Sequence, residues 1–379
     1  MQTESLIFFR STQQKIMYFL TRYWWLTPLL IFIIWRIILE IFARGVWDSG
    51  IPSPWFNFPH PPLWARWDTG WYKSIVEHGY YLKGAGKMNN TTFFPLYPLL
   101  WHTLRPLFAS GFTAGLVIAQ FFAGFVFLFF YRFVLERWDA PTARRAVIAL
   151  ACFPSSLFLL AAYTEALFLF LTIGCLWFLH RRSFAAAALF AGIASATRPI
   201  GILLWPTLLL FWWLERKKER GGWPPWSLVV LPPLGILFFS LWLWYQVGNP
   251  LAWFSSQAGA GRGFVWPPLL LYAYAKNILL MGPFWQRQLA EAAALIFLLM
   301  QLPALYRLHP AFAFHAASNL LPSLFSNTLT SLPRFLLVIP TIFIVLALQR
   351  RTYYWLYILT AVPLLLFSVT QFVNWRWAG

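Results

Sequence analysis

Charged residues are scarce in this chain, and cysteines are scarcer still. Only 11% of its 379 residues are Asp, Glu, Lys or Arg, whereas 60% are hydrophobic and 21% are aromatic. The two cysteines, Cys152 and Cys175, lie inside apolar runs, which favours small core residues over a disulfide or a metal site. Long apolar runs recur from Leu26 to the C-terminus. A soluble core cannot bury so many of them, so the sequence predicts an all-α polytopic membrane protein.

The chain also lacks the patterns of several other functional classes. It has no glycine-rich phosphate loop and no dinucleotide-binding fingerprint. His309 and His315 have no companions at metal-ligand spacing, so we expect no metal site from them. No internal repeat or low-complexity tract is evident, which favours one membrane domain over residues 1–379. The 29 basic and 11 acidic residues are assigned to loops facing anionic lipid, and no nucleic-acid partner is expected.

The apolar runs predict about eleven transmembrane segments, several of them short, tilted or kinked by proline. The first run follows a basic segment with Arg10, Lys15 and Arg22 and lacks a cleavage pattern, which favours an uncleaved signal anchor. The predicted spans are 26–43, 111–131, 145–162, 165–179, 184–197, 199–214, 227–246, 291–306, 310–322, 335–348 and 353–373.

The distribution of Lys and Arg over the predicted loops favours a cytoplasmic N-terminus. With that orientation, residues 44–110 form a long first extracytoplasmic loop with a re-entrant segment, and residues 247–290 form a second long outer segment. The turns at Glu165, Arg198 and Arg334 fall on the same side. The unusual polar groups of the chain therefore gather on one extracytoplasmic face.

Asp68 stands directly before a predicted short helix, residues 69–78. In one interpretation it is the N-cap, because an Asp at that position accepts hydrogen bonds from the next turn. In the other it is a general base in a partly dry pocket at the membrane surface, where low dielectric and neighbouring charges tune a carboxylate. The two roles are compatible.

Three further charged residues interrupt apolar sequence. Glu165 suits a helix N-terminus in a tight turn, and a role in a polar site is equally open. An arginine at the centre of a membrane helix, such as Arg198, costs roughly 2.5 to 3.5 kcal/mol on insertion scales, and the following proline breaks the helix there. A guanidinium held in such a place pairs with a carboxylate or a phosphate. Arg334 is similar, and snorkelling to headgroups is the alternative for both arginines.

Two segments rich in helix breakers complete the pattern. The run Phe93-Phe94-Pro95-Leu96-Tyr97-Pro98 has two prolines three residues apart, which predicts a kinked or re-entrant segment reaching residue 108. A simple helix start is the alternative. The glycines of residues 259–263 fit either a lid that approaches a ligand closely or a flexible linker.

Taken together, these blocks resemble the PIG-V family of GPI mannosyltransferase 2-like proteins. The chain is shorter than expected of a eukaryotic member, so a bacterial relative in the plasma membrane with an acceptor other than GPI is expected. The blocks that carry the resemblance are, in chain order, Arg66-Trp67-Asp68, Tyr72, His78-Gly79-Tyr80, Phe93-Phe94-Pro95-Leu96-Tyr97-Pro98, Tyr163-Thr164-Glu165, Thr197-Arg198-Pro199, Asn249-Pro250-Leu251-Ala252 with Gln257, and Leu332-Pro333-Arg334.

The resemblance implies a GT-C type bundle whose first extracytoplasmic loop carries short interfacial helices. It implies a hexosyltransferase that takes a sugar, mannose by expectation, from a polyprenyl-phosphate donor to a lipid, glycan or protein hydroxyl. No cofactor is expected, since the lipid-linked sugar phosphate is a substrate, and the divalent metal requirement is left open. A transporter or flippase of lipid-linked sugars is the alternative, but it predicts polar groups on both faces and an internal repeat.

Residue roles follow from the same resemblance and from a hypothesis of inverting transfer. Asp68 is carried over as the catalytic carboxylate, and Arg198 and Arg334 are candidate ligands of the donor phosphate. The candidate substrate-binding residues are Arg66, Trp67, Tyr72, His78, Tyr97, Tyr163, Glu165 and Gln257.

Overall fold

The computed structural model describes residues 23–48, 61–84, 87–216, 223–376 and 378. Within these ranges the chain is helical, and its one β-pairing is an isolated antiparallel bridge between Phe264 and Ser326. The basic residues of the expected signal anchor lie outside the described ranges. The α-helices are α2 (Leu26–Val46), α3 (Thr69–His78), α4 (Leu96–Leu104), α5 (Thr113–Arg137), α6 (Ala140–Ala151), α7 (Glu165–His180), α8 (Phe184–Ser195), α9 (Leu204–Arg216), α10 (Trp226–Val230), α11 (Leu234–Val247), α12 (Ala252–Ser255), α13 (Pro267–Leu279), α14 (Trp285–Leu308), α15 (Pro310–Ser318), α16 (Leu321–Leu324), α17 (Leu332–Leu337), α18 (Pro340–Leu348) and α19 (Arg351–Val373). The 3-10 helices are η1 (Asn90–Thr92), η2 (Arg105–Leu107), η3 (Ser156–Leu159), η4 (Pro199–Leu203) and η5 (Ala258–Ala260).

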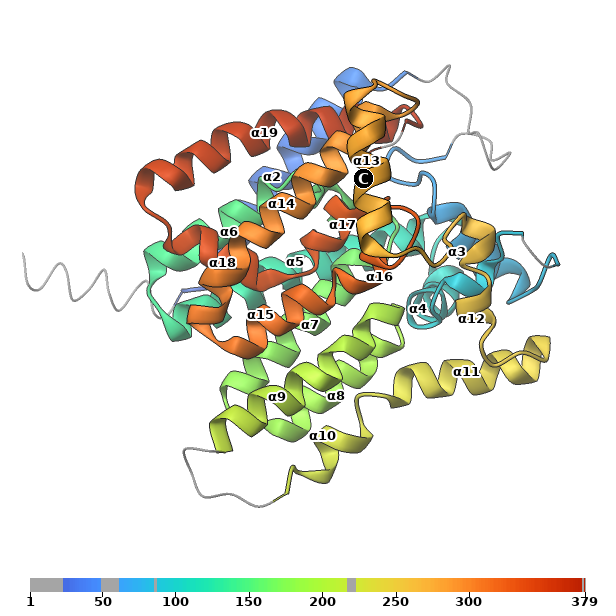
Figure 1. The fold of residues 1–379 in the computed structure, drawn as a ribbon, viewed down its shortest axis with the longest axis horizontal. Helices are drawn as coiled ribbons and strands as arrows, with labels where there is room; N and C mark the ends of the chain where they lie inside the picture. Colours follow the sequence, from blue (N-terminus) through green and yellow to red (C-terminus); the bar gives the residue numbers. More distant parts are fainter. Residues whose placement is uncertain (1–22, 49–60, 85–86, 217–222, 377, 379) are drawn as a thin grey trace, which may run out of the picture.

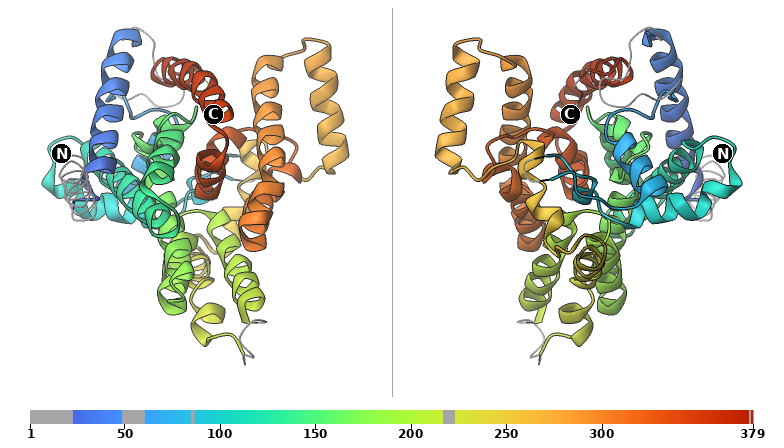
Figure 2. Two further views of the ribbon diagram at one scale, coloured as in Figure 1. Left: turned by 90° about the vertical axis from the view of Figure 1, so that its left-hand side faces the viewer. Right: turned by 90° about the vertical axis from the view of Figure 1, so that its right-hand side faces the viewer.

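Four of the described helices, α2, α5, α14 and α19, are long and apolar enough to cross a membrane. Shorter apolar helices, α7, α8 and α11, accompany them. In Figure 2, α19 lies between α2 on one side and the α13–α14 pair on the other. Helix α5 packs against α2, α6 and α7. The expectation of an all-α chain with membrane-spanning helices is therefore supported, whereas eleven spans are not confirmed.

Proline explains several differences between the predicted spans and the helices. The predicted span 227–246 is divided into α10 and α11 around Pro232 and Pro233, and the span 335–348 is divided into α17 and α18 ahead of Pro340. The span 199–214 begins as the 3-10 helix η4, with Pro199 in its first turn. A proline has no backbone N–H and its ring clashes with the preceding turn, so a helix ends or restarts there.

The predicted span 145–162 differs most from the structure. Helix α6 ends at Ala151, and the chain continues through Pro154 as irregular backbone with only the short η3 before α7 begins at Glu165. The residues from Ser155 to Tyr163 are buried. The backbone N–H of Ala162 donates to the Trp64 carbonyl at 3.1 Å. Non-helical backbone is therefore buried in protein, as it must be at membrane depth, and it reaches the first loop.

The first loop contributes α3 and α4, which pack on each other and lie together with α12 at one end of the molecule (Figure 1). Helix α3 has the predicted bounds. In α4, the Tyr97 hydroxyl donates to the Gly115 carbonyl at 2.8 Å, which ties α4 to α5. A Cβ added at Gly115 would lie 2.6 Å from the Trp101 ring, so the close approach of the two helices requires glycine there.

Candidate active site

Two arginines and two carboxylates from four distant segments form one continuous chain of ion pairs. Arg198 Nη1 lies 2.7 Å from Glu165 Oε1, and Arg334 Nε lies 3.4 Å from the same oxygen. Arg334 Nη1 lies 2.7 Å from Asp68 Oδ2. The order is thus Arg198, Glu165, Arg334, Asp68. We call these four residues the ion-pair cluster, and the structure brings together here four residues that the sequence singled out separately.

Asp68 occupies the N-cap position of α3, but its carboxylate does not cap the helix. It turns to Arg334 instead, while the Asp68 backbone N–H donates to the Tyr163 hydroxyl at 3.0 Å. The preceding residue, Trp67, has φ 48, a left-handed conformation that is uncommon outside glycine. Packing against Trp375, with ring centroids 5.9 Å apart, accompanies that conformation. The local backbone therefore directs the carboxylate away from its own helix and toward α17.

Burial separates the two carboxylates of the cluster. The Asp68 side chain keeps 27% of its surface exposed, against 14% for Arg334 and 2% for Glu165. Glu165 is the first residue of α7, where the helix dipole favours a negative charge. Its Oε2 is a buried acceptor without a hydrogen-bond partner in the described chain. Asp68 is therefore the carboxylate that an incoming molecule can reach, whereas Glu165 is the internal counterion.

Two tyrosines line the cluster. Tyr163 accepts the Asp68 N–H, and its ring lies 5.5 Å from the Arg334 guanidinium carbon. The Tyr72 hydroxyl lies 3.3 Å from Thr164 Oγ1. Burial, followed by the neighbouring carboxylates, raises the pKa of both phenols above their ordinary value. Both are neutral hydroxyls at physiological pH and hence available as hydrogen-bond donors.

A third arginine, Arg262, approaches the cluster from the loop between η5 and α13, and sequence reasoning missed it. The guanidinium carbons of Arg198, Arg262 and Arg334 lie 5.6, 5.5 and 6.0 Å from the centroid of the Phe335 ring. Burial and the charge of Arg334 lower the pKa of Arg262 to about 10. The glycines of this loop drew attention in the sequence, but it is the arginine between them that approaches the cluster.

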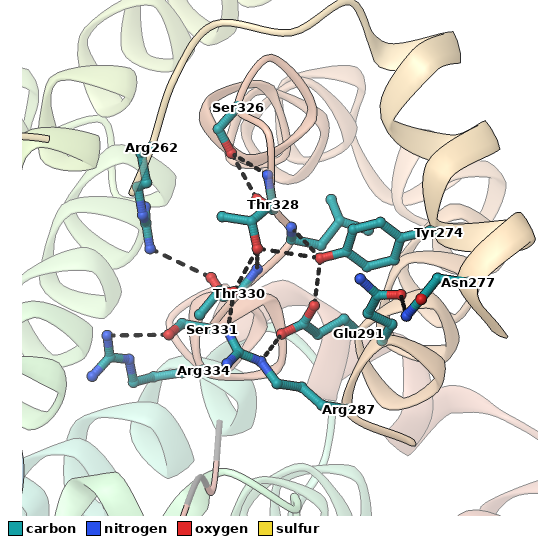
Figure 3. Close-up of polar contacts among 12 residues, drawn as sticks. Arg262, Tyr274, Asn277, Arg287, Glu291, Ser326, Thr328, Thr330, Ser331 and Arg334 are labelled. Atoms are coloured by element: carbon teal, nitrogen blue, oxygen red, sulfur yellow. Dashed lines mark hydrogen bonds and ion pairs between the residues drawn. The ribbon is translucent and has the colours of Figure 1, made fainter. Parts of the chain in front are cut away.

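The segment before Arg334 is held by a second polar network, shown in Figure 3. Glu291 in α14 is fully buried and accepts hydrogen bonds from the Tyr274 hydroxyl at 2.6 Å and from Arg287 Nε at 2.9 Å. Arg287 also contacts Thr330 Oγ1, and the Tyr274 hydroxyl accepts the Leu329 N–H at 2.7 Å. Helices α13 and α14 thereby fix the chain that leads into α17. None of these residues was singled out from the sequence.

Other sequence-predicted site residues lie apart from the cluster. The Arg66 guanidinium is buried and donates to the carbonyls of Pro62 at 2.7 Å and Val373 at 3.2 Å, so it ties the first loop to the end of α19. Tyr97 is occupied with α5. His78 is exposed at the far end of α3, roughly 15 Å along the helix from Asp68 at 1.5 Å per residue. Gln257 reaches the site indirectly, because its carbonyl accepts the Arg262 backbone N–H at 3.1 Å.

A separate cleft of about 730 Å³ lies beside α3 and the chain that follows α4. It is lined by Pro62, Lys73, Glu77, His102, Arg105, Pro106, Phe108, Ala109, Ser110, Gly111 and Phe112. None of its lining residues belongs to the ion-pair cluster. Lys73 follows Asp68 by five residues, which is about 140° around an α-helix, so the cleft and the cluster lie on different faces of α3. The cluster, with its converging charges, is the better candidate for chemistry.

Among the described residues, no group of three His, Cys, Asp or Glu side chains lies close enough together to hold a metal ion. The two carboxylates of the cluster face arginines. The chemistry that this arrangement can perform is proton transfer at Asp68 and stabilisation of an anion by guanidinium groups.

Comparison with known proteins gives a distant similarity over part of the chain. No family model matches it. It is 34% identical over 188 residues to GPI alpha-1,6-mannosyltransferase 2 of Cricetulus griseus, covering 46% of this chain and 35% of the relative. The protein of the same name from Rattus norvegicus is 32% identical, covering 45% of this chain and 34% of the relative. The matched region thus spans about a third of the length of these relatives.

The motifs predicted a resemblance to mannosyltransferases, and the comparison confirms it over less than half of the chain. Among solved structures, the chain matches the oligosaccharyltransferase of Archaeoglobus fulgidus in the apo form. That match covers 94% of this chain and 56% of the other at 12% identity, with a TM-score of 0.46.

Proposed function

We propose that this protein is a membrane glycosyltransferase that transfers a sugar, mannose by preference, from a polyprenyl-phosphate donor to a hydroxyl of a lipid, glycan or protein acceptor. The observation that carries the proposal is the ion-pair cluster, in which a partly exposed carboxylate stands beside arginines that are 12% and 14% exposed. Similarity to mannosyltransferases over 46% of the chain supports the same reaction class.

Asp68 is the general base in this proposal. Its carboxylate takes the proton of the acceptor hydroxyl as that oxygen attacks the anomeric carbon from the side opposite the phosphate. The bond between the anomeric carbon and the phosphate oxygen breaks, its electron pair stays on the phosphate, and the configuration at carbon is inverted. The contact with Arg334 Nη1 at 2.7 Å orients the carboxylate. A base must lie within hydrogen-bond reach of the hydroxyl, and the exposure of Asp68 permits that contact.

Arg198 and Arg334 stabilise the leaving group. The phosphate gains negative charge as the bond breaks, so cations fixed around it stabilise the transition state more than the ground state. Glu165, whose side chain is only 2% exposed, holds Arg198 and Arg334 in place and does not itself contact the sugar. The neutral hydroxyls of Tyr72 and Tyr163 lie close enough to the cluster to donate to the same sugar.

The position of the site fits a substrate with a membrane-embedded tail. The cluster joins the first loop to α7, η4 and α17. The long apolar helices of the same chain expose large hydrophobic side chains, which suit membrane lipids and the isoprenoid chain. We place this end of the molecule at the extracytoplasmic face, on the distribution of Lys and Arg over the loops. A bacterial plasma membrane remains the sequence-based expectation for the compartment.

The test is transfer by purified, reconstituted protein, supplied with radiolabelled polyprenyl-phosphate sugars and a native membrane lipid extract. We expect label to move from the mannose donor to an acceptor, and Asp68→Asn to lower the rate by about 10²- to 10⁴-fold, the usual contribution of general-base catalysis. Asp139→Asn is the matched control: Asp139 caps α6 through the Thr142 N–H, and Asn caps equally well. Transfer at the wild-type rate by Asp68→Asn would refute the assigned role.

A further inference from the structure

Three arginines converge on the site, but only two of them are paired with carboxylates. Arg198 faces Glu165, and Arg334 faces both Glu165 and Asp68. Within the described parts of the chain, the Arg262 side chain has no carboxylate within 4.0 Å, and its one hydrogen bond is long, from Nη2 to the Thr330 carbonyl at 3.4 Å. The site therefore carries one positive charge in excess, and that charge is located on Arg262.

The position of Arg262 is fixed by the backbone around it. Gly261, with φ 74, takes the left-handed turn that a glycine adopts without strain, and the Arg262 N–H donates back to the Gln257 carbonyl at 3.1 Å. After the arginine, the Asn327 N–H donates to the Gly263 carbonyl at 2.9 Å and the Val265 N–H donates to the Phe325 carbonyl at 3.2 Å. The loop is thus fastened to the segment that leads into α17, and Figure 3 shows Arg262 pointing from it toward Thr330.

A guanidinium in this position is unfavourable without an anion. Burial and two neighbouring arginines disfavour the charged form, which agrees with the lowered pKa of Arg262. Arg262 is partly buried, and an anion that forms hydrogen bonds with the guanidinium offsets the cost of leaving its charge unpaired. The planar fork of an arginine matches the oxygens of a phosphate group. Arg198 and Arg334 lie on the same ring of Phe335, so such an anion would contact the whole site.

We infer that Arg262 is a ligand of the lipid-linked phosphate, in the donor and in the polyprenyl phosphate product, while Arg334 chiefly holds Asp68. The inference rests on the proposed function for the identity of the anion. The three arginines then have different roles: Arg198 and Arg334 are balanced by the carboxylates of Glu165 and Asp68, and the unpaired charge of Arg262 attracts the phosphate.

The inference is tested by measuring how tightly the protein binds an isoprenoid phosphate in the absence of sugar transfer. Purified protein in detergent is titrated with farnesyl phosphate, farnesol and inorganic phosphate, and complexes are counted by native mass spectrometry. We expect the wild type to bind farnesyl phosphate more tightly than either of the other two, because only it offers both phosphate and isoprenoid. Arg262→Gln should weaken that binding about tenfold or more, the usual loss of a charge-assisted hydrogen bond, and leave farnesol binding unchanged.

Two further variants separate phosphate binding from support of the loop. If Arg262 only supports the loop, Arg262→Gln should change the binding of farnesol and of farnesyl phosphate alike, or change neither, and either result overturns the inference. Arg262→Lys retains the charge and should keep part of the affinity. Arg105→Ala, which removes an exposed arginine of η2, should bind like the wild type. A loss as large in Arg105→Ala as in Arg262→Gln would show general charge attraction and overturn the assignment.

The same titration distinguishes this inference from the proposed function. Wild-type protein that binds farnesyl phosphate no better than farnesol contradicts the polyprenyl-phosphate donor itself, and the inference fails with it. Wild-type protein that discriminates between them, together with unchanged binding by Arg262→Gln, contradicts only the role of Arg262. Inorganic phosphate bound as tightly as farnesyl phosphate would overturn the lipid-linked identity of the anion.

Discussion

Replacing Glu165 by Gln tests whether a single buried carboxylate keeps the site intact. Glu165 Oε1 lies within 3.4 Å of nitrogens of both Arg198 and Arg334, and its side chain is only 2% exposed. The change retains volume and one carbonyl oxygen but removes the charge. Arg198 then has no counterion in the cluster, while Arg334 keeps Asp68. Removing one partner of a buried ion pair costs about 3 to 5 kcal/mol, because the remaining charge is left uncompensated.

The chain contains a matched control for this change. Glu136 at the end of α5 also bridges two arginines, at 2.8 Å to Arg132 and 2.7 Å to Arg181, but these side chains are 34% and 47% exposed. Solvent compensates exposed charges, so such pairs contribute about 0 to 1 kcal/mol. We therefore expect Glu165→Gln to lower the free energy of unfolding by about 3 kcal/mol or more and Glu136→Gln to lower it by less than about 1 kcal/mol.

The assay is reversible unfolding in mixed micelles by titration with sodium dodecyl sulfate, followed by circular dichroism. Transfer activity per folded molecule should fall in Glu165→Gln, because Arg198 loses its carboxylate and Arg334 loses one of two, and should persist in Glu136→Gln. Equal destabilisation by the two variants would refute the reasoning from burial. A neutral effect of Glu165→Gln on both stability and activity would show that its charge does not organise the arginines.

Three further outcomes follow from the same geometry. Asp68→Asn should change the unfolding free energy by about 1 kcal/mol or less, since its pair with Arg334 is partly exposed; a loss as large as in Glu165→Gln would contradict this. Tyr163→Phe removes the acceptor of the Asp68 N–H and should lower the transfer rate about tenfold. The affinity for farnesyl phosphate should stay unchanged. Gly115→Ala should destabilise the protein by about 1 to 3 kcal/mol in the same unfolding titration, because the new Cβ meets Trp101 at 2.6 Å. Gly124→Ala in the same helix meets its nearest atom at 3.6 Å and should be neutral or stabilising.

The four residues of the ion-pair cluster could be singled out from the sequence because charge is rare in an apolar chain. Asp68, Glu165, Arg198 and Arg334 each interrupt apolar sequence, and topology alone assigned them to one face. Sequence left their partners open, because such a guanidinium could pair with a carboxylate or with a phosphate. In the structure each arginine faces a carboxylate. Pairing depends on side-chain direction across four segments, which no local pattern encodes.

The residues that sequence reasoning missed have ordinary local explanations. Arg287 and Glu291 are four residues apart in α14, which on sequence alone is a common surface pair of a helix. Only the fold places Tyr274 and Thr330 against them. The irregular chain from Ser155 to Tyr163 was predicted as part of a span because its side chains are apolar. Burial among protein neighbours demands the same composition as burial in lipid, so apolarity could not distinguish the two.

On the proposed mechanism, the charge of the site stays balanced through the reaction. Three arginines face the carboxylates of Asp68 and Glu165 together with the single negative charge of a phosphodiester, so the occupied site is neutral. When the acceptor proton reaches Asp68, that carboxylate loses its charge as the departing phosphate gains one. Arg334, which contacts Asp68 and lies beside the same aromatic ring as Arg262, is placed between the group that loses charge and the group that gains it. Negative charge thus moves across a fixed set of guanidinium groups, and little reorganisation of the surroundings is required.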